Sequence, residues 1–137
     1  MSGWWFAAGC VGLFLLLWAF MARRWRSEVA RLAASRPNLG EDEFVSAITE
    51  IADPDIAAYL WDELADYWSP ATPHPDDDFL NSLSIDPDEP QDWLERFCQQ
   101  RGYDWRAWPT WDEGRPTTVR SFAAWLAEGR RYAEASA

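Results

Sequence analysis

The chain has 137 residues, and its 12 Lys and Arg stand against 23 Asp and Glu, giving a net charge of −11. Every acidic residue follows residue 27. Residues 27–137 contain 9 arginines and all 23 acids, so their net charge is 9 − 23 = −14. This charge argues against a nucleic-acid-binding protein, because neutralising phosphates requires a cationic surface.

Residues 4–22 contain no charged side chain. As a helix they would measure about 28 Å, close to the ~30 Å hydrocarbon thickness of a bilayer. The ends carry the residue types that anchor helices at membrane interfaces. These are Trp4 and Trp5 at the start of the segment, and Arg23, Arg24, Trp25 and Arg26 directly after it. Because positive flanks stay in the cytoplasm, the sequence predicts a single-pass inner-membrane protein with its amino terminus outside and residues 27–137 inside.

Two alternatives compete with a transmembrane anchor. A cleaved signal peptide has a basic start, a short apolar stretch and a cleavage site of small residues. Here the start is uncharged and the Arg-rich residues 23–26 stand where a peptidase would cut. A helix that is apolar all round also fits a buried core helix. Within the span, the small-residue spacing of Ala8 and Gly12 is compatible with a homodimer.

The predicted domains are an anchor at 1–26, a juxtamembrane helix and linker at 27–40, and an acidic helical domain at 41–137. A break is expected at 36–40, which reads Arg-Pro-Asn-Leu-Gly. A helix over 41–52 places Phe44, Val45, Ile48 and Ala52 on one face. Asp53 and Pro54 predict the start of the next helix, with an apolar stripe from Ile56 to Tyr67.

Residues 69–87 contain four prolines and are expected to be an ordered loop, pinned by Phe79, Leu80, Leu83 and Ile85. Asp88 or Glu89 then caps a helix with Pro90 at its first position and Gly102 as its terminator. The inward face of that helix would carry Trp93, Leu94, Phe97 and Cys98.

A connector rich in aromatic rings follows, with Tyr103, Trp105, Trp108 and Trp111. These rings are expected to fill the core, and a ligand cage or a partner's binding hot spot are the alternatives. Thr117 or Thr118 would cap a last helix that ends at Gly129, with Val119, Phe122, Ala123 and Leu126 inward. No segment alternates with period two for long, so the body is predicted to be all-α.

The sequence offers few groups for catalysis. His74 is the single histidine and lies between two prolines, which is typical of a surface loop. The acidic run at Asp76, Asp77 and Asp78 is more typical of a solvated loop than of a cation site. Cys10 and Cys98 have neither disulfide nor metal-ligand spacing. We therefore expect no metal, no cofactor and no enzymatic activity.

Four short motifs point to a family: Ile85-Asp86-Pro87-Asp88-Glu89, Trp93-Leu94-Glu95-Arg96-Phe97, Pro116-Thr117-Thr118-Val119 and Gly129-Arg130. Together with the expected order of helices, they resemble the acyl carrier protein superfamily over about residues 54–132. The closer likeness is to small uncharacterised bacterial acyl-carrier-like proteins. The resemblance implies a small helical bundle with an acidic helix that docks onto basic patches of partner proteins.

The sequence departs from working carriers at the attachment site. Carriers have Asp-Ser-Leu at the start of their second helix, and the serine bears phosphopantetheine. When aligned on Asp86, this chain has Pro87 at the serine position and Asp88 at the leucine position. Ser82 and Ser84 lie nearby, but neither directly follows the aspartate.

These observations predict a membrane-tethered, non-enzymatic interaction protein, either an adaptor or an immunity-type protein. It would present an acidic surface to a protein partner with a basic face. The residues expected to bind that partner are Asp86, Asp88, Glu89, Asp92 and Glu95. The alternative function is that of an atypical acyl or peptidyl carrier with a displaced attachment serine.

Overall fold

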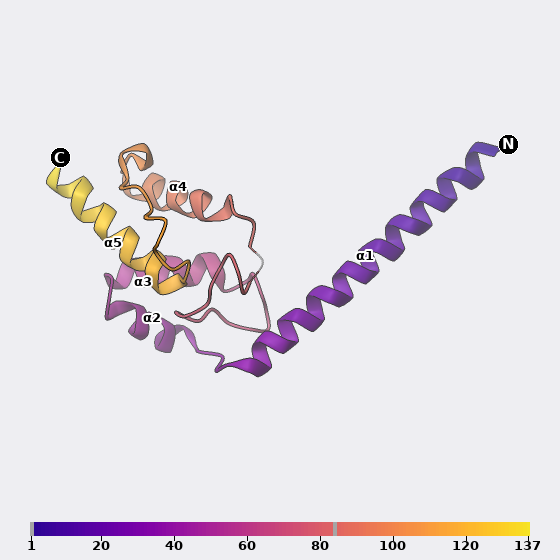
Figure 1. Ribbon diagram of the computed structural model, residues 1–137, viewed down its shortest axis with the longest axis horizontal. Helices are drawn as coiled ribbons and strands as arrows, with labels where there is room; N and C mark the ends of the chain where they lie inside the picture. The colour runs from indigo at the N-terminus through magenta and orange to yellow at the C-terminus, as the bar shows by residue number, and fades with distance from the viewer. Residues whose placement is uncertain (1, 84) are drawn as a thin grey trace. The chain divides into compact units, whose positions relative to one another are not determined.

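A computed structural model describes residues 2–83 and 85–137 of the chain (Figure 1). The helices in chain order are α1 (Ser2–Ser35), α2 (Glu41–Thr49), α3 (Pro54–Leu64), α4 (Glu89–Arg101), the short 3-10 helix η1 (Trp105–Ala107) and α5 (Val119–Ala135). Over the described residues there is no β-strand, and a single antiparallel bridge pairs Asp78 with Thr118. The prediction of an all-α chain is confirmed.

The chain forms two compact units, Met1–Pro37 and Asn38–Ala137. The first is built on α1, which has 34 residues and continues past the Arg cluster as expected. Its most apolar window has a mean hydropathy of 2.0, and none of that window is buried. The helix is therefore long and apolar enough to cross a membrane, two criteria that a signal sequence also meets.

Local sequence signals set most helix ends in the second unit. Asp53 precedes α3 and Pro54 is its first residue, as predicted. Gly102 ends α4 with a φ of 75°, in the left-handed region where glycine has no steric penalty. The Thr118 hydroxyl accepts a hydrogen bond from the Ser121 N–H at the start of α5. Pro90 is the second residue of α4, one place later than expected.

Three helix ends differ from the predictions. The helix expected over 41–52 already ends at Thr49, and α3 ends at Leu64. Gly129 does not terminate α5, which continues to Ala135. A Cβ on Gly129 would lie 1.9 Å from Cε2 of Trp108. The absence of a side chain at Gly129 therefore allows α5 to pack closely against Trp108 of the connector.

Three aromatic rings form the centre of the second unit. Trp93 of α4, Phe122 of α5 and Phe79 of the long loop are all buried. Their centroids are 5.6 to 5.8 Å apart and each pair meets edge to face. This is the geometry that aromatic quadrupoles favour, so one cluster joins segments that are distant in the sequence.

The loop between α3 and α4 is ordered as predicted. Phe79, Leu83 and Ile85 are buried, whereas Leu80 is 37% exposed and does not pin the loop. Two backbone hydrogen bonds of 3.0 Å join it to the start of α5, from Phe79 N–H to the Thr117 carbonyl and from Val119 N–H to the Asp77 carbonyl.

Ion pairs connect the helices at the edge of this core. Arg96 of α4 donates two hydrogen bonds, of 3.0 and 2.8 Å, to the Glu63 carboxylate of α3. Arg130 of α5 pairs with both Asp53 and Asp55 at the start of α3, and Arg101 of α4 also reaches Asp55. The hydrogen bonds from Arg130 are the largest cause that lowers the pKa of Asp55 to about 2.

Candidate functional site

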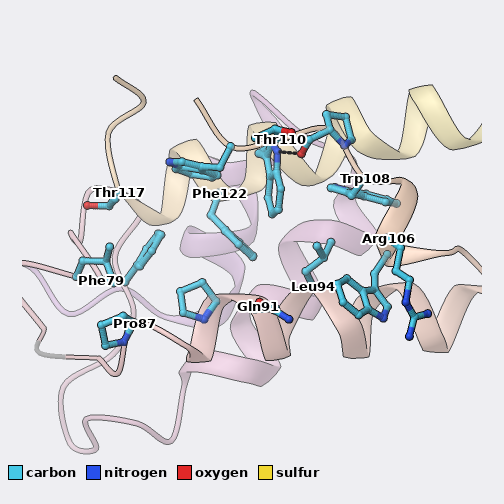
Figure 2. Close-up of a pocket in the computed structure, with 15 residues that line it drawn as sticks. Phe79, Pro87, Gln91, Leu94, Arg106, Trp108, Thr110, Thr117 and Phe122 are labelled. Carbon is cyan, nitrogen blue, oxygen red and sulfur yellow. Dashed lines mark hydrogen bonds between the residues drawn. The ribbon is translucent and has the colours of Figure 1, made fainter. Parts of the chain in front are cut away.

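An apolar hollow of about 520 Å³ opens between α4, the connector and α5 (Figure 2). We call it the aromatic groove. Most of the residues that line it are aromatic, proline or leucine. The lining comprises Phe79, Leu80, Pro87, Pro90, Gln91, Leu94, Trp105, Arg106, Trp108, Pro109, Thr110, Trp111, Thr117, Phe122 and Trp125.

The connector forms one wall of the groove because α5 holds it in place. The Trp125 indole N–H donates a 3.0 Å hydrogen bond to the Pro109 carbonyl, the dashed line in Figure 2. The Trp111 ring lies edge to face against Trp125 at 5.2 Å. Arg115 lies 5.2 Å from the Trp111 centroid and pairs with Glu128 of α5 at 2.9 Å. The wall is therefore a fixed surface of aromatic rings.

The predicted core filling by the connector is only partly what the structure shows. Trp108 is buried, in agreement with the prediction. Trp105 and Trp111 remain half-buried, and both line the groove. Sequence analysis named the ring cluster as a candidate ligand cage but did not identify the groove, because the residues from α4 and the long loop that complete it are remote in sequence.

Arg106 is the one charged residue that lines the groove in the described part of the chain. Its guanidinium lies 4.8 Å from the Trp105 ring centroid. The nearest carboxylate is that of Asp104, at 3.9 Å, and both side chains are well exposed. In Figure 2 Arg106 stands at one end of the lining, and Phe79, Pro87 and Thr117 stand at the other.

The five predicted partner-binding acids lie at the start of α4 and along it, and they differ in how free they are. The Asp86 carboxylate accepts a 3.0 Å hydrogen bond from the Asp88 N–H, so it shapes the turn before the helix. Glu89 is half-buried and accepts a 2.7 Å hydrogen bond from the Tyr67 hydroxyl. That bond is one of the causes that raise the pKa of Tyr67, after burial. Glu95 accepts from the Gln91 side chain at 3.0 Å.

Asp88 and Asp92 are the two exposed acids of this set that make no side-chain hydrogen bond or ion pair within the described residues. Asp88 is the N-cap residue of α4 and Asp92 lies in its first turn, so both acids stand at the start of the helix. Pro87, Pro90, Gln91 and Leu94 line the groove and are interleaved with these acids in the sequence. Asp86 and Asp88 thus flank a groove-lining residue along the chain, and Asp92 belongs to the helix that supplies three of the lining residues.

The acidic run in the long loop has structural partners. Asp76 pairs with Arg120 at 3.0 Å, and the buried Asp77 accepts from the His74 N–H. Burial would raise the pKa of Asp78, but hydrogen bonds from Asn81 and Thr117 outweigh it and lower that pKa. His74 accepts a 3.1 Å hydrogen bond from the Asp76 N–H through Nδ1. Among the residues described, no three His, Cys, Asp or Glu side chains gather as a metal site would require.

Two serines lie near the position that corresponds to the attachment site in the carrier hypothesis. Ser82 is exposed, and its backbone N–H donates to the Asp78 carbonyl. Ser84 lies outside the described residues. Pro87, which the carrier hypothesis aligns with the attachment serine, has no hydroxyl to modify and lines the aromatic groove.

The predicted membrane flank lies on α1 with its side chains exposed. Trp4, Trp5 and Trp25 are all exposed, as are Arg23 and Arg26. Arg24 pairs with Glu28 at 3.2 Å, one helical turn later. Ala8 and Gly12 line a shallow hollow on the helix surface together with Trp4 and Leu15.

Comparison of the chain with family models, with curated proteins and with solved structures finds no match.

Proposed function

We propose that this chain is a membrane-tethered, non-enzymatic interaction protein. Helix α1 is the anchor, and the acidic surface of α4 binds a protein partner with a basic face at the cytoplasmic leaflet. An adaptor and an immunity-type protein both fit this description. The observation that supports it best is the exposed pair Asp88 and Asp92, which is free of ion pairs within the described residues.

The distribution of arginines explains why acids at the start of α4 keep their negative charge without an ion-pair partner. The chain has no lysine, and most arginines of the second unit are paired with carboxylates elsewhere: Arg96, Arg101, Arg115, Arg120 and Arg130. The acids of α4 therefore keep most of their negative potential. Such a potential attracts a partner of opposite charge and raises its association rate.

The anchor gives this surface its place of action. Arg23, Arg24 and Arg26 follow the apolar segment directly, and no acid precedes it. This pattern favours insertion with the second unit on the cytoplasmic side. Holding the acidic surface in the plane of the membrane raises its effective concentration toward partners that are also membrane-bound.

The decisive experiment compares partner capture by two neutralised variants. The tagged full chain is purified from membranes in mild detergent, and co-purifying proteins are identified by mass spectrometry at low and high salt. We expect Asp88→Asn with Asp92→Asn to reduce capture severalfold at low salt. The difference shrinks at ~1 M salt, where screening acts within about 3 Å.

The matched control neutralises Asp62 and Asp66, which are also exposed acids four residues apart but do not border the groove. Capture by that variant remains that of the native chain. Equal loss in both variants would mean that total charge matters and the α4 surface does not. Glu89 is left unchanged because its bond to Tyr67 belongs to the fold.

We also propose that the body is acyl-carrier-like over about residues 54–132. The order of α3, a long ordered loop, α4, a short connector and α5 supports this. The alternative function, an atypical acyl or peptidyl carrier, rests on the exposed hydroxyl of Ser82. Intact-mass analysis after incubation with a phosphopantetheinyl transferase tests this alternative. An unchanged mass would exclude a carrier function.

A homodimer through α1 remains part of the proposal. The hollow beside Ala8 and Gly12 is a place where a second helix can approach closely. Gly12→Ile should abolish such a dimer in detergent, whereas Gly9→Ile, outside the hollow, should not. A monomer in the native chain would exclude the dimer.

A further inference from the structure

We propose that the aromatic groove binds a short peptide segment of the basic partner, with apolar or aromatic side chains in the groove and Arg or Lys residues beside them on the acids of α4. This inference rests on the proposed function and specifies the chemistry that the partner must present.

The size and lining of the groove fit an apolar guest. Its volume of about 520 Å³ lies within the about 300–1,000 Å³ typical of ligand sites. Leu80, Trp105 and Trp111 leave apolar surface open to solvent there. Of the polar lining, the Thr117 hydroxyl is already committed to the Asp78 carboxylate at 2.6 Å. A guest would therefore bury mainly hydrocarbon and aromatic surface, which is the term that drives such binding.

The charge around the groove selects the kind of apolar guest. Asp86 and Asp88 flank the lining residue Pro87, and Glu95 accepts a 3.0 Å hydrogen bond from the side chain of the lining residue Gln91. Glu95 and Asp104 lie beside a second hollow of about 530 Å³ that shares Trp105 and Arg106 with the groove. Among the described lining residues the one cation is Arg106, which already lies 3.9 Å from the Asp104 carboxylate. The charge around the groove is therefore negative. It attracts a cationic amphipathic segment and repels an anionic amphiphile.

The geometry also favours a segment of a protein over an isolated cation. The lining runs from Phe79 and Pro87 at one end to Arg106 at the other (Figure 2). Asp92 is on the same helix as the lining residues Gln91 and Leu94, and Asp88 directly precedes that helix. One short segment that places apolar side chains between basic ones would engage both surfaces at once, and such anchors carry most of the energy in peptide recognition.

The test uses the full chain in lipid nanodiscs, so that detergent does not fill the groove, and labelled synthetic peptides observed by fluorescence anisotropy. The probe has phenylalanines flanked by arginines. Three comparison ligands separate the contributions: the same peptide with glutamate flanks, the same peptide with serine in place of phenylalanine, and decanoate as a competing amphiphile. Only the Arg–Phe peptide is expected to bind, and decanoate is expected not to displace it.

Substitution of two apolar residues that line the groove, Leu80 and Trp105, locates the binding. Leu80→Ser, at the edge of the groove, should weaken the Arg–Phe peptide roughly fivefold or more. Ile51→Ser is the matched control, because Ile51 is also 37% exposed but does not line the groove. Its affinity should equal that of the native chain. Trp105→Gln should weaken binding in the same direction as Leu80→Ser.

Failure of this inference is distinguishable from failure of the proposed function. If Asp88→Asn with Asp92→Asn lowers partner capture but Leu80→Ser and Trp105→Gln leave peptide binding unchanged, the acidic surface acts alone and the groove proposal is wrong. Absent binding of the Arg–Phe peptide also overturns it. Equal binding of the glutamate-flanked peptide, or displacement by decanoate, would show that the groove takes amphiphiles without regard to basic charge.

Discussion

Gly129 of α5 packs directly against the indole of Trp108, because a Cβ at this glycine would lie 1.9 Å from Trp108 Cε2 and 2.1 Å from its Nε1. The surface of α5 at Gly129 thereby accommodates the Trp108 ring, which directly follows the 3-10 helix η1 in the connector. Trp108 in turn contacts Phe97 of α4, with 6.1 Å between the ring centroids. The missing side chain at position 129 thus allows α4, the connector and α5 to share one packed layer.

Gly129→Ala should therefore destabilise the second unit even though alanine is the better helix former. The added methyl group overpacks the site at a cost of about 1–3 kcal/mol, which exceeds the ~1 kcal/mol gained in helix propensity. Thermal unfolding followed by circular dichroism measures the change. The same substitution made together with Trp108→Leu should cost less stability. The control is Gly114→Ala, where a Cβ meets no atom within 4 Å, and it should leave the stability nearly unchanged. An unchanged midpoint in Gly129→Ala would contradict the packing described.

The pairing of Asp55 with Arg130 and Arg101 predicts a loss of stability in acid. The folded pKa of Asp55 is about 2, below the ordinary 3.8, so its contribution is complete above about pH 4 and is lost as the pH falls toward 2. The Asp55 side chain is 49% exposed, and solvent screening limits this contribution to about 1 kcal/mol. The free energy of unfolding of the native chain and of Asp55→Asn should differ by that amount at neutral pH and converge near pH ~2.

The control for the acid experiment is Asp62→Asn. Asp62 is exposed and has no ion pair within the described residues. Its substitution should change the free energy of unfolding by a few tenths of a kcal/mol at any pH. A pH-independent difference for Asp55→Asn would argue against the ion pair as the source of its stabilisation.

Cys98 should be unreactive in the folded protein. Its side chain is fully buried in α4, and burial raises the pKa of the thiol to about 11. In a Cys10→Ser background it is the single thiol. Thiol labelling should proceed at the rate of unfolding and become fast in denaturant. Rapid labelling under native conditions would show that α4 opens locally.

The orientation of the anchor can be tested by the same chemistry. The variants are made in a chain with Cys10→Ser and expressed in cells. An impermeant maleimide should label Gly3→Cys from outside the cell. It should label Ala137→Cys only after the membrane is permeabilised. Changing Arg23, Arg24 and Arg26 to glutamate removes the positive flank and should weaken this bias. Labelling of Ala137→Cys in intact cells would reverse the proposed topology, and a shortened mass would indicate cleavage of the apolar segment.

The features that sequence analysis predicted correctly depend on neighbouring residues. Pro54 and Gly102 set helix ends through their backbone preferences, and Thr118 does so through its side-chain cap, so these signals are visible in the sequence. Gly129 was misinterpreted because it carries the same signal as Gly102, and only the position of Trp108 distinguishes the two.

The groove and the ion pairs depend on residues that are far apart along the chain. Arg130 reaches Asp55 across 75 positions, and no local pattern identifies that pair. The acids at and after the start of α4 can be recognised as a group from the sequence alone. Which of them are free, however, depends on partners such as Tyr67, which lies 22 positions from Glu89.

The ring cluster of Phe79, Trp93 and Phe122 has a consequence for the order of events during synthesis. Its last member belongs to α5, so the ribosome must complete most of the polypeptide before the cluster can close. Helix α1, whose hydrogen bonds are all local, can form long before that. With α1 as the membrane anchor proposed above, the nascent chain is delivered to the bilayer first and acquires its folded interior afterwards.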